Sequence, residues 1–221
     1  MNYGCGPDPT NTYRARNDTE RMSSSPSGGT TATTGSDPSI AREAVGGAVA
    51  GAAAYLVGYL SVYLTQSGRI EEGLSGLNFL AELFGGDPIS TWQVSGWLFY
   101  NAHFVETVSP AVFGGTSSRN LLMQAEGAGY LLLVPPVLLL VAGLVAGRVA
   151  GADSPLAGAR SGALVAAGYL PLAVVGAFLF RYAVGNGSVA PDIVTAVLLA
   201  GAVYPAVFGA IGGAGSSALS N

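Results

Sequence analysis

The sequence has few charged residues and no lysine. Only 10% of its 221 residues are Asp, Glu, Lys or Arg, and all nine basic residues are arginine. A soluble domain carries about a quarter charged residues, so this chain has too few to solvate a globular surface. This scarcity excludes an ordinary water-soluble enzyme. It also excludes a nucleic-acid binder, which needs a basic face.

Cysteine and histidine are nearly absent, with one residue of each. Cys5 has no partner for an intramolecular disulfide, so the chain is not a disulfide-stapled secreted module. A metal site needs three or four ligands, which these residues cannot supply. The absence of lysine excludes Schiff-base chemistry, and the common phosphate-binding, hydrolase and zinc-protease motifs are missing. The sequence therefore predicts no enzyme, no catalytic or metal site and no cofactor.

Long apolar runs are the main feature that is present. Half of the residues are apolar, and four runs approach or exceed the length of about 20 residues that a helix needs to cross a membrane. The predicted spans are residues 44–64, 129–147, 161–180 and 193–213. Short loops join the last three, which should pack as antiparallel neighbours. The sequence predicts an all-α, polytopic bundle in the cell membrane, with the lipid bilayer as its surroundings.

Polar segments flank this predicted transmembrane domain, which covers residues 42–215. Residues 1–41 are predicted to be a disordered N-terminal tail, because residues 23–39 are rich in Ser, Thr, Pro and Gly and cannot bury a core. Residues 216–221 form a short C-terminal tail. Residues 66–126, between the first two spans, are predicted to form a helical interfacial cap.

Two segments of this cap differ in character. Apolar residues recur at helical spacing from Ile70 to Phe84, which predicts a short amphipathic helix that ends at Gly85. Residues 88–105 are uncharged and rich in aromatic side chains. We interpret them as an interfacial or re-entrant segment. A fifth span is the alternative, because their length is at the lower limit for crossing a membrane.

The distribution of arginine predicts that the N-terminus is cytoplasmic. With four spans, six arginines lie on the N-terminal side of the membrane and three on the other side. With five spans, the tally is the same. The two models differ only in the side on which the C-terminus lies.

A candidate polar site lies in the aromatic segment. His103 and Glu106 are three residues apart, so a helix would place both on one face, where they could handle a proton. Hydrogen-bonded polar side chains with a structural role are the competing interpretation. The neighbouring aromatic residues predict an aromatic belt at headgroup level or, alternatively, a wall that binds an apolar or cationic solute. The candidate site comprises Trp92, Trp97, Tyr100, Asn101, His103 and Glu106.

Prolines interrupt three consecutive spans, at Pro135, Pro136, Pro171 and Pro205. Each proline deprives a carbonyl four residues earlier of its donor, and broken helices of transporters bind ions through such carbonyls. No ionisable side chain lies in the middle of a span, which argues against an ion-coupled pump. Glycines spaced four apart predict close helix packing within the bundle, with homo-oligomerisation as the alternative.

Several segments resemble a family of small haloarchaeal integral membrane proteins of unknown function, some of which are labelled transporters. They are GYLSVYL, LFGGDPISTW and GWLFYNAHFVE within residues 57–106, then AGYLPLAVVGAFLFRYAVG and PDIVTAVLLAGAVYPAVFGA. The resemblance covers about residues 42–215 and implies no site residue. The pI near 4.8 and the absence of lysine are also typical of proteins from salt-loving archaea.

These observations predict a non-enzymatic membrane component that acts through self-assembly or through a membrane protein partner. A small-solute transporter or channel is the alternative function, and the prolines in three consecutive spans are the observation that favours it.

Overall fold

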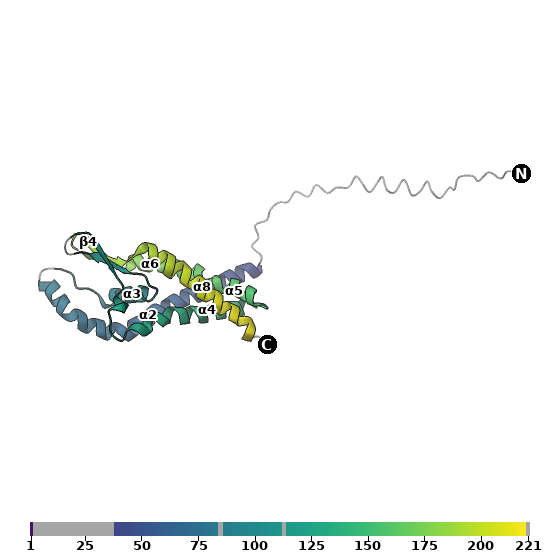
Figure 1. Cartoon of the computed structure of the whole chain (residues 1–221), viewed down its shortest axis with the longest axis horizontal. Coiled ribbons are helices and arrows are strands. Elements are labelled where there is room, and N and C mark those ends of the chain that lie inside the picture. Colours follow the sequence, from purple (N-terminus) through teal and green to yellow (C-terminus); the bar gives the residue numbers. More distant parts are fainter. Residues whose placement is uncertain (2–37, 84–85, 112–113, 220–221) are drawn as a thin grey trace. The chain divides into compact units, whose positions relative to one another are not determined.

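The computed structural model describes residues 1, 38–83, 86–111 and 114–219. The chain divides into two units, Met1–Gly35 and Ser36–Asn221, and every helix and strand described below belongs to the second. Most of the predicted tail, residues 2–37, lies outside the described residues. Figure 1 gives the arrangement and labels of the elements.

The first helix, α2, runs without interruption from Pro38 to Leu83 over 46 residues. At 1.5 Å per residue it is about 70 Å long, more than twice the thickness of the hydrocarbon core. The predicted first span and the predicted amphipathic helix are therefore one helix. No proline separates them, and one exposed glycine, Gly68, is too weak a breaker to end a helix.

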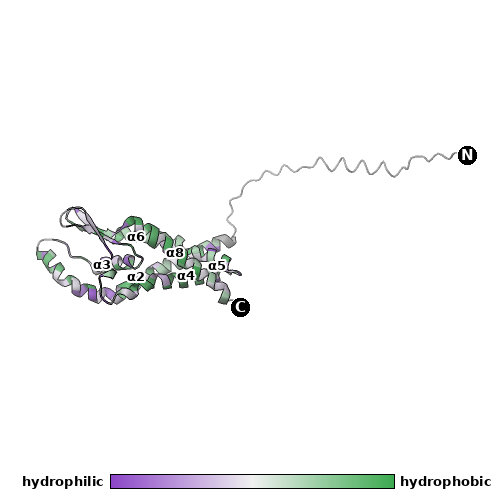
Figure 2. Cartoon of the chain, viewed as in Figure 1, coloured by the Kyte–Doolittle hydropathy of each residue, from purple (hydrophilic) through white to green (hydrophobic). Residues whose placement is uncertain are grey.

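Three more helical segments are long and apolar enough to cross a membrane. With Ala41–Leu83 they make four candidate spans, and the other three are Gly129–Ala150, Pro155–Leu179 and Ile193–Ser216. The four predicted spans are confirmed. In Figure 2 the ribbon of these segments is largely green, for hydrophobic residues, whereas purple, for hydrophilic residues, lies along the distal part of α2.

Each of these three segments is built from shorter pieces. They are η3 (Gly129–Leu133) with α4 (Val134–Ala150), α5 (Pro155–Ala163) with α6 (Val165–Leu179), and α7 (Ile193–Thr195) with the π-helical η4 (Ala196–Val203) and α8 (Tyr204–Ser216). Two other short 3₁₀ turns are η2 (Leu121–Met123) and η5 (Ser217–Leu219).

The aromatic segment forms a short helix, α3, and does not add a fifth span. The helix runs from Thr91 to Asn101. Its 11 residues make about 16 Å of helix, half of what a crossing requires. Four segments of the described chain are therefore long and apolar enough to cross a membrane, and the end of α8 lies at the same end of the bundle as the start of α2 (Figure 1).

The cap also contains a small β-sheet, which was not predicted. Its strands are β1 (Thr107–Pro110), β2 (Thr116–Arg119), β3 (Tyr182–Val184) and β4 (Gly187–Pro191). The order is β2-β1-β4-β3, and the central pair aligns Thr107 with Pro191 and Val108 with Ala190. The predicted helical cap at 66–126 therefore also contains two strands, and the loop between the third and fourth spans completes the sheet.

Glycines bring the helices together at the end of the bundle away from the cap. A Cβ atom built on Gly143 of α4 would overlap the carbonyl oxygen of Gly209 on α8. One built on Gly162 of α5 would overlap the same oxygen. The predicted role of the glycines in close packing within the bundle is confirmed.

The two ends of the bundle differ in charge. We call the end with the sheet the cap end, and the end with the start of α2 and the C-terminus of α8 the terminal end (Figure 1). The cap end carries three arginines and seven acidic residues: Arg69, Arg119, Arg181, Glu71, Glu72, Glu82, Asp87, Glu106, Glu126, Asp192. The described terminal end carries Arg42, Arg148, Arg160, Glu43 and Asp153.

Candidate functional site

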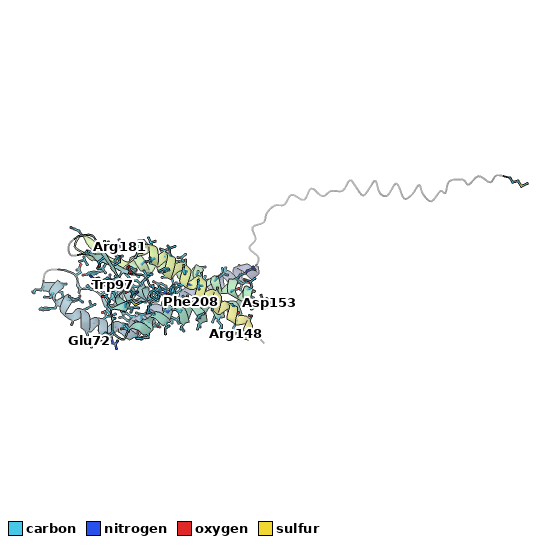
Figure 3. The ribbon with its side chains drawn as sticks, viewed as in Figure 1. Glu72, Trp97, Arg148, Asp153, Arg181 and Phe208 are labelled. Atoms are coloured by element: carbon cyan, nitrogen blue, oxygen red, sulfur yellow. The ribbon has the colours of Figure 1, made fainter. Side chains whose placement is uncertain are left out.

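Helix α3 packs against α2 and against the C-terminal end of α6 at the cap end. Most of its side chains are buried, including Trp97 and Tyr100. The indole N–H of Trp97 donates to the carbonyl oxygen of Phe180 at 2.7 Å, and Gln93 Nε2 donates to that of Arg181 at 2.9 Å. These bonds attach α3 to the C-terminal end of α6 and the start of the following strand. Figure 3 labels Trp97 and Arg181 in this part of the molecule.

Aromatic rings fill the space between α3 and the spanning helices. The ring of Tyr55 meets Phe99 edge-to-face at a centroid distance of 5.1 Å and Tyr169 at 5.2 Å. The Tyr55 and Tyr100 hydroxyls lie 3.2 Å apart, and Tyr100 donates to the carbonyl oxygen of Ala173. Such edge-to-face pairs add stabilisation beyond the area that they bury.

His103 is fully buried in this aromatic cluster, in the turn that follows α3. Its Nδ1 lies 2.9 Å from the carbonyl oxygen of Phe99, and its Nε2 lies 2.7 Å from the hydroxyl of Tyr169. Because a carbonyl only accepts, Nδ1 carries the proton and Nε2 accepts from Tyr169. Burial lowers the pKa of His103 to about 4, so the imidazole is neutral at pH 7.

The structure does not bring Glu106 to His103. Helix α3 ends at Asn101, so the two residues share no helical face. His103 points into the core, whereas Glu106 is exposed on extended chain just before β1. The partner of His103 is Tyr169, which the sequence analysis did not single out. The available signal was that Tyr169 is the one tyrosine of the predicted span 161–180.

Asn101 ties the end of α3 to the sheet and to η2. Its Nδ2 donates to the carbonyl oxygen of Val105 at 2.7 Å and to Thr107 Oγ1 at 3.1 Å. Its Oδ1 accepts from the backbone N–H of Leu121 at 2.8 Å. Asn120 Nδ2 donates to the backbone carbonyl of Asn101 at 3.0 Å. One fully buried amide therefore joins three segments of the cap.

Trp92 lies apart from this core, at the edge of a lateral groove between α2 and α6. The groove has a volume of about 220 Å³ and an almost entirely apolar lining that includes Tyr59, Trp92 and Phe180. The hydroxyl of Tyr59 donates to the carbonyl oxygen of Trp92 at 3.2 Å. Of the two tryptophans, Trp92 is partly exposed and Trp97 is buried.

The four prolines lie at changes of helix type or inside α6. Pro135 and Pro136 occupy the first turn of α4, where a proline has no helical hydrogen bond to lose. The carbonyl of Leu131 accepts from Val134 instead. Pro171 is inside α6. Pro205 follows the π-helical η4, in which the N–H of Tyr204 donates to the carbonyl oxygen of Leu199, five residues earlier.

Among the described residues, no group of three or more His, Cys, Asp and Glu side chains is positioned to hold a metal ion.

A model for DUF7978, a family of unknown function, matches residues 25–220. The chain belongs to this family. No curated protein and no solved structure matches the chain. Membership of DUF7978 carries no activity or substrate, so a functional conclusion depends on the geometry of this member.

The buried polar side chains of this site, His103 and Asn101, are bonded to other groups of the protein. Both nitrogens of His103 and the side-chain amide of Asn101 have protein partners. A buried network with its bonds satisfied fixes a unique packing. The arrangement can therefore hold the cap rigidly on the spanning helices.

Proposed function

We propose that this chain is a non-enzymatic integral membrane component that acts by assembly, through the distal end of α2. The support is four apolar side chains in this part of the helix that are exposed: Leu77, Phe79, Leu80 and Leu83. Phe79 and Leu83 have relative exposures of 66% and 67%. They lie beyond the uncharged stretch 44–64 that fills the hydrocarbon core, so lipid chains do not cover them. Contiguous exposed apolar surface of this kind is typical of an interaction site.

The shape of this surface favours another helix as the occupant. Gly73 and Gly76 fall on the same arc of α2 as Phe79, Leu80 and Leu83, given 3.6 residues per turn. A Cβ on either glycine would meet no atom within 4 Å, so a partner helix can approach the backbone closely. If all copies of the chain insert into the membrane in one orientation, this segment of α2 lies at the same distance from the membrane surface in every copy. A second copy of the chain, related by a two-fold axis, therefore meets the geometric requirements.

We also propose that the terminal end faces the cytoplasm. Arg42, Arg148 and Arg160 lie there at the ends of spanning helices, and three more arginines precede α2 in the sequence. Arginine close to a span favours the cytoplasmic side. The cap, with its excess of acidic residues, then faces outward. The acidity of the cap and the absence of lysine from the chain are typical of proteins that function at high salt concentration.

The assembly proposal is tested by the mass of the full-length protein in nanodiscs, measured by mass photometry. We expect a dimer for the wild type and a monomer for the double variant Phe79→Asp with Leu83→Asp. Val184→Asp is the matched control, because Val184 is an exposed apolar residue on β3 of the same cap.

A wild type that stays monomeric over the accessible concentration range would overturn the self-assembly proposal. If a different protein co-purifies stoichiometrically from native membranes and is lost in the double variant, the occupant is that protein and not a second copy. If the dimer persists in the double variant, another surface assembles the chain.

A small-solute transporter is the second candidate function. The observation that favours it is that two helix irregularities lie beside His103. Tyr169, its hydrogen-bond partner, is two residues before Pro171, and the ring of Tyr204, next to Pro205, lies 5.2 Å from the imidazole. Irregular helices that meet at a polar group mark the sites of transporters. Solute flux in proteoliposomes above that of empty vesicles, lost on Tyr169→Phe, would support this function; flux equal to empty vesicles would remove it.

A further inference from the structure

A second groove runs along the opposite side of α2, where the helix faces α4. Small and aliphatic side chains line it, and its volume is about 210 Å³. The lining residues are Ala50, Ala53, Ala54, Val57, Leu138, Val141, Ala142 and Val145. Alanines on both helices leave the space that larger side chains would fill. Val57, Val141 and Val145 are exposed, so the groove opens sideways to the hydrocarbon.

A polar pocket lies at the terminal end of the same helices. Its volume is about 310 Å³, and its lining includes Glu43 of α2, Asp153 of the α4–α5 turn, and Arg160 and Ser161 of α5. The hydroxyl of Ser161 donates to Glu43 Oε2 at 3.4 Å. Arg160 forms no ion pair within residues 38–83, 86–111 and 114–219. Figure 3 labels Asp153 at this end of the molecule.

The pocket and the groove are aligned along one face of α2. Glu43, Ala50, Ala54 and Val57 recur at intervals of seven, four and three residues, which keeps them on one side of a helix. Ten residues from Glu43 to Ala53 rise about 15 Å, half the thickness of the hydrocarbon core. That distance matches one leaflet. Between pocket and groove, α2 and α4 approach closely at Gly46 and Val149, so a chain would pass outside this contact.

We propose that this face binds a zwitterionic phospholipid from the leaflet at the terminal end. The Arg160 guanidinium binds the phosphate, and the Glu43 and Asp153 carboxylates bind the headgroup ammonium. One hydrocarbon chain lies in the groove between α2 and α4. The charge pattern selects the headgroup, because a purely anionic lipid would satisfy Arg160 but meet two carboxylates of its own sign.

Native mass spectrometry of the full-length protein in detergent tests this proposal. The added probes are a phosphoethanolamine lipid, a phosphoglycerol lipid with the same chains, and water-soluble phosphoethanolamine. We expect the phosphoethanolamine lipid to be retained about tenfold more than the other two, the difference that one charged hydrogen bond makes. Equal retention of the two lipids overturns the headgroup assignment. Equal retention of soluble phosphoethanolamine and its lipid overturns the role of the groove.

Two pairs of variants locate the lipid. Arg160→Gln should lower retention about tenfold, whereas Arg42→Gln, an exposed arginine at the same end, should not change it. Val141→Phe should fill the groove and lower retention, whereas Val207→Phe, a lipid-facing position on α8, should leave it unchanged. If Arg160→Gln and Val141→Phe both retain the lipid like the wild type, binding is unspecific and the proposal fails.

Discussion

The two halves of the bundle are packed by opposite means. At the terminal end, backbones touch directly because glycine leaves nothing between them: a Cβ on Gly158 would overlap the carbonyl oxygen of Gly213. At the cap end, aromatic rings fill the space, and Phe99 alone meets the rings of Tyr55, Tyr100 and His103. Close backbone contacts at glycines stabilise the terminal half, whereas contacts between large aromatic side chains stabilise the cap half.

Helices α2 and α6 show both kinds of packing within two turns. A Cβ on Gly168 of α6 would overlap the carbonyl oxygen of Ala48, whereas the hydroxyl of Tyr55 lies under Gly176. The backbones of the two helices touch where side chains are missing, and tyrosine side chains fill the space between them nearer to α3. The difference indicates that α3 is part of the core of the fold. Substitutions in the two halves should therefore lower the free energy of unfolding by different mechanisms: loss of packed side chains at the cap end and steric overlap at the terminal end.

The largest effect is expected from Phe99→Ala. Phe99 is fully buried at the centre of the ring cluster, so its removal leaves a cavity. We expect the free energy of unfolding to fall by about 3–5 kcal/mol, measured by reversible denaturation in detergent. Phe178→Ala is the control, because Phe178 is exposed on α6 and borders no such cluster. A loss for Phe178→Ala as large as for Phe99→Ala would contradict a core at the cap end.

Gly162→Ala tests the other half with a single methyl group. The new Cβ would overlap the carbonyl oxygen of Gly209, and backbone can move only if the helices separate. We expect the free energy of unfolding to fall by about 1–3 kcal/mol, as for other overpacked cores. Gly68→Ala makes the same chemical change where no atom lies within 4 Å. It should stabilise the protein by up to about 1 kcal/mol through helix propensity, so the two variants should differ in sign.

The pH dependence of stability probes His103, the only histidine of the chain. The pKa of His103 is about 4 when folded and near 6.5 when unfolded. The unfolded chain therefore binds a proton first as the pH falls, and the free energy of unfolding decreases from pH 6.5 towards pH 4. At 1.36 kcal/mol per pKa unit, the full loss approaches about 3 kcal/mol.

His103→Gln isolates that effect. The variant removes the titrating group, so its free energy of unfolding should change little between pH 7 and pH 5.5. A wild type that is equally flat over this interval would mean that the imidazole is solvated and not buried among Phe99, Tyr169 and Tyr204.

The sequence predicted the spans and the glycine contacts because each depends on local composition. A run such as 129–147 must be helical wherever lipid surrounds it, and glycines spaced four apart need only a neighbouring helix. The continuity of α2 was missed because the first span was limited to the uncharged run 44–64, and the helical pattern from Ile70 onward was interpreted as a separate helix. Charged side chains favour water over lipid around that part of the helix, but they do not interrupt its backbone hydrogen bonds.

The sheet and the buried histidine depend on distant residues. Strands of three to five residues carry little pattern, and the β1–β4 pair joins Thr107 to Pro191 across two spans. His103 and Glu106 were expected on one face, an expectation that required α3 to continue beyond Asn101. The helix ends there because the Asn101 side chain binds the backbone of Val105 and Leu121, which local spacing cannot reveal.

The smallest expected effect is that of salt concentration on stability, which should differ between the two ends because their charges differ. The cap end has seven acidic residues against three arginines, whereas the described terminal end has two against three. Raising the salt from 0.1 M to 1 M shortens the Debye length from about 10 Å to 3 Å and screens the repulsion within the cap. We expect a rise in the free energy of unfolding of less than about 1 kcal/mol, since these charges are exposed. Replacing Glu71, Glu72 and Glu82 with Gln should reduce that rise. Replacing Glu43 with Gln and Asp153 with Asn, at the terminal end, should not. Equal effects of the two sets of substitutions would mean that the asymmetry of charge does not affect the free energy of unfolding.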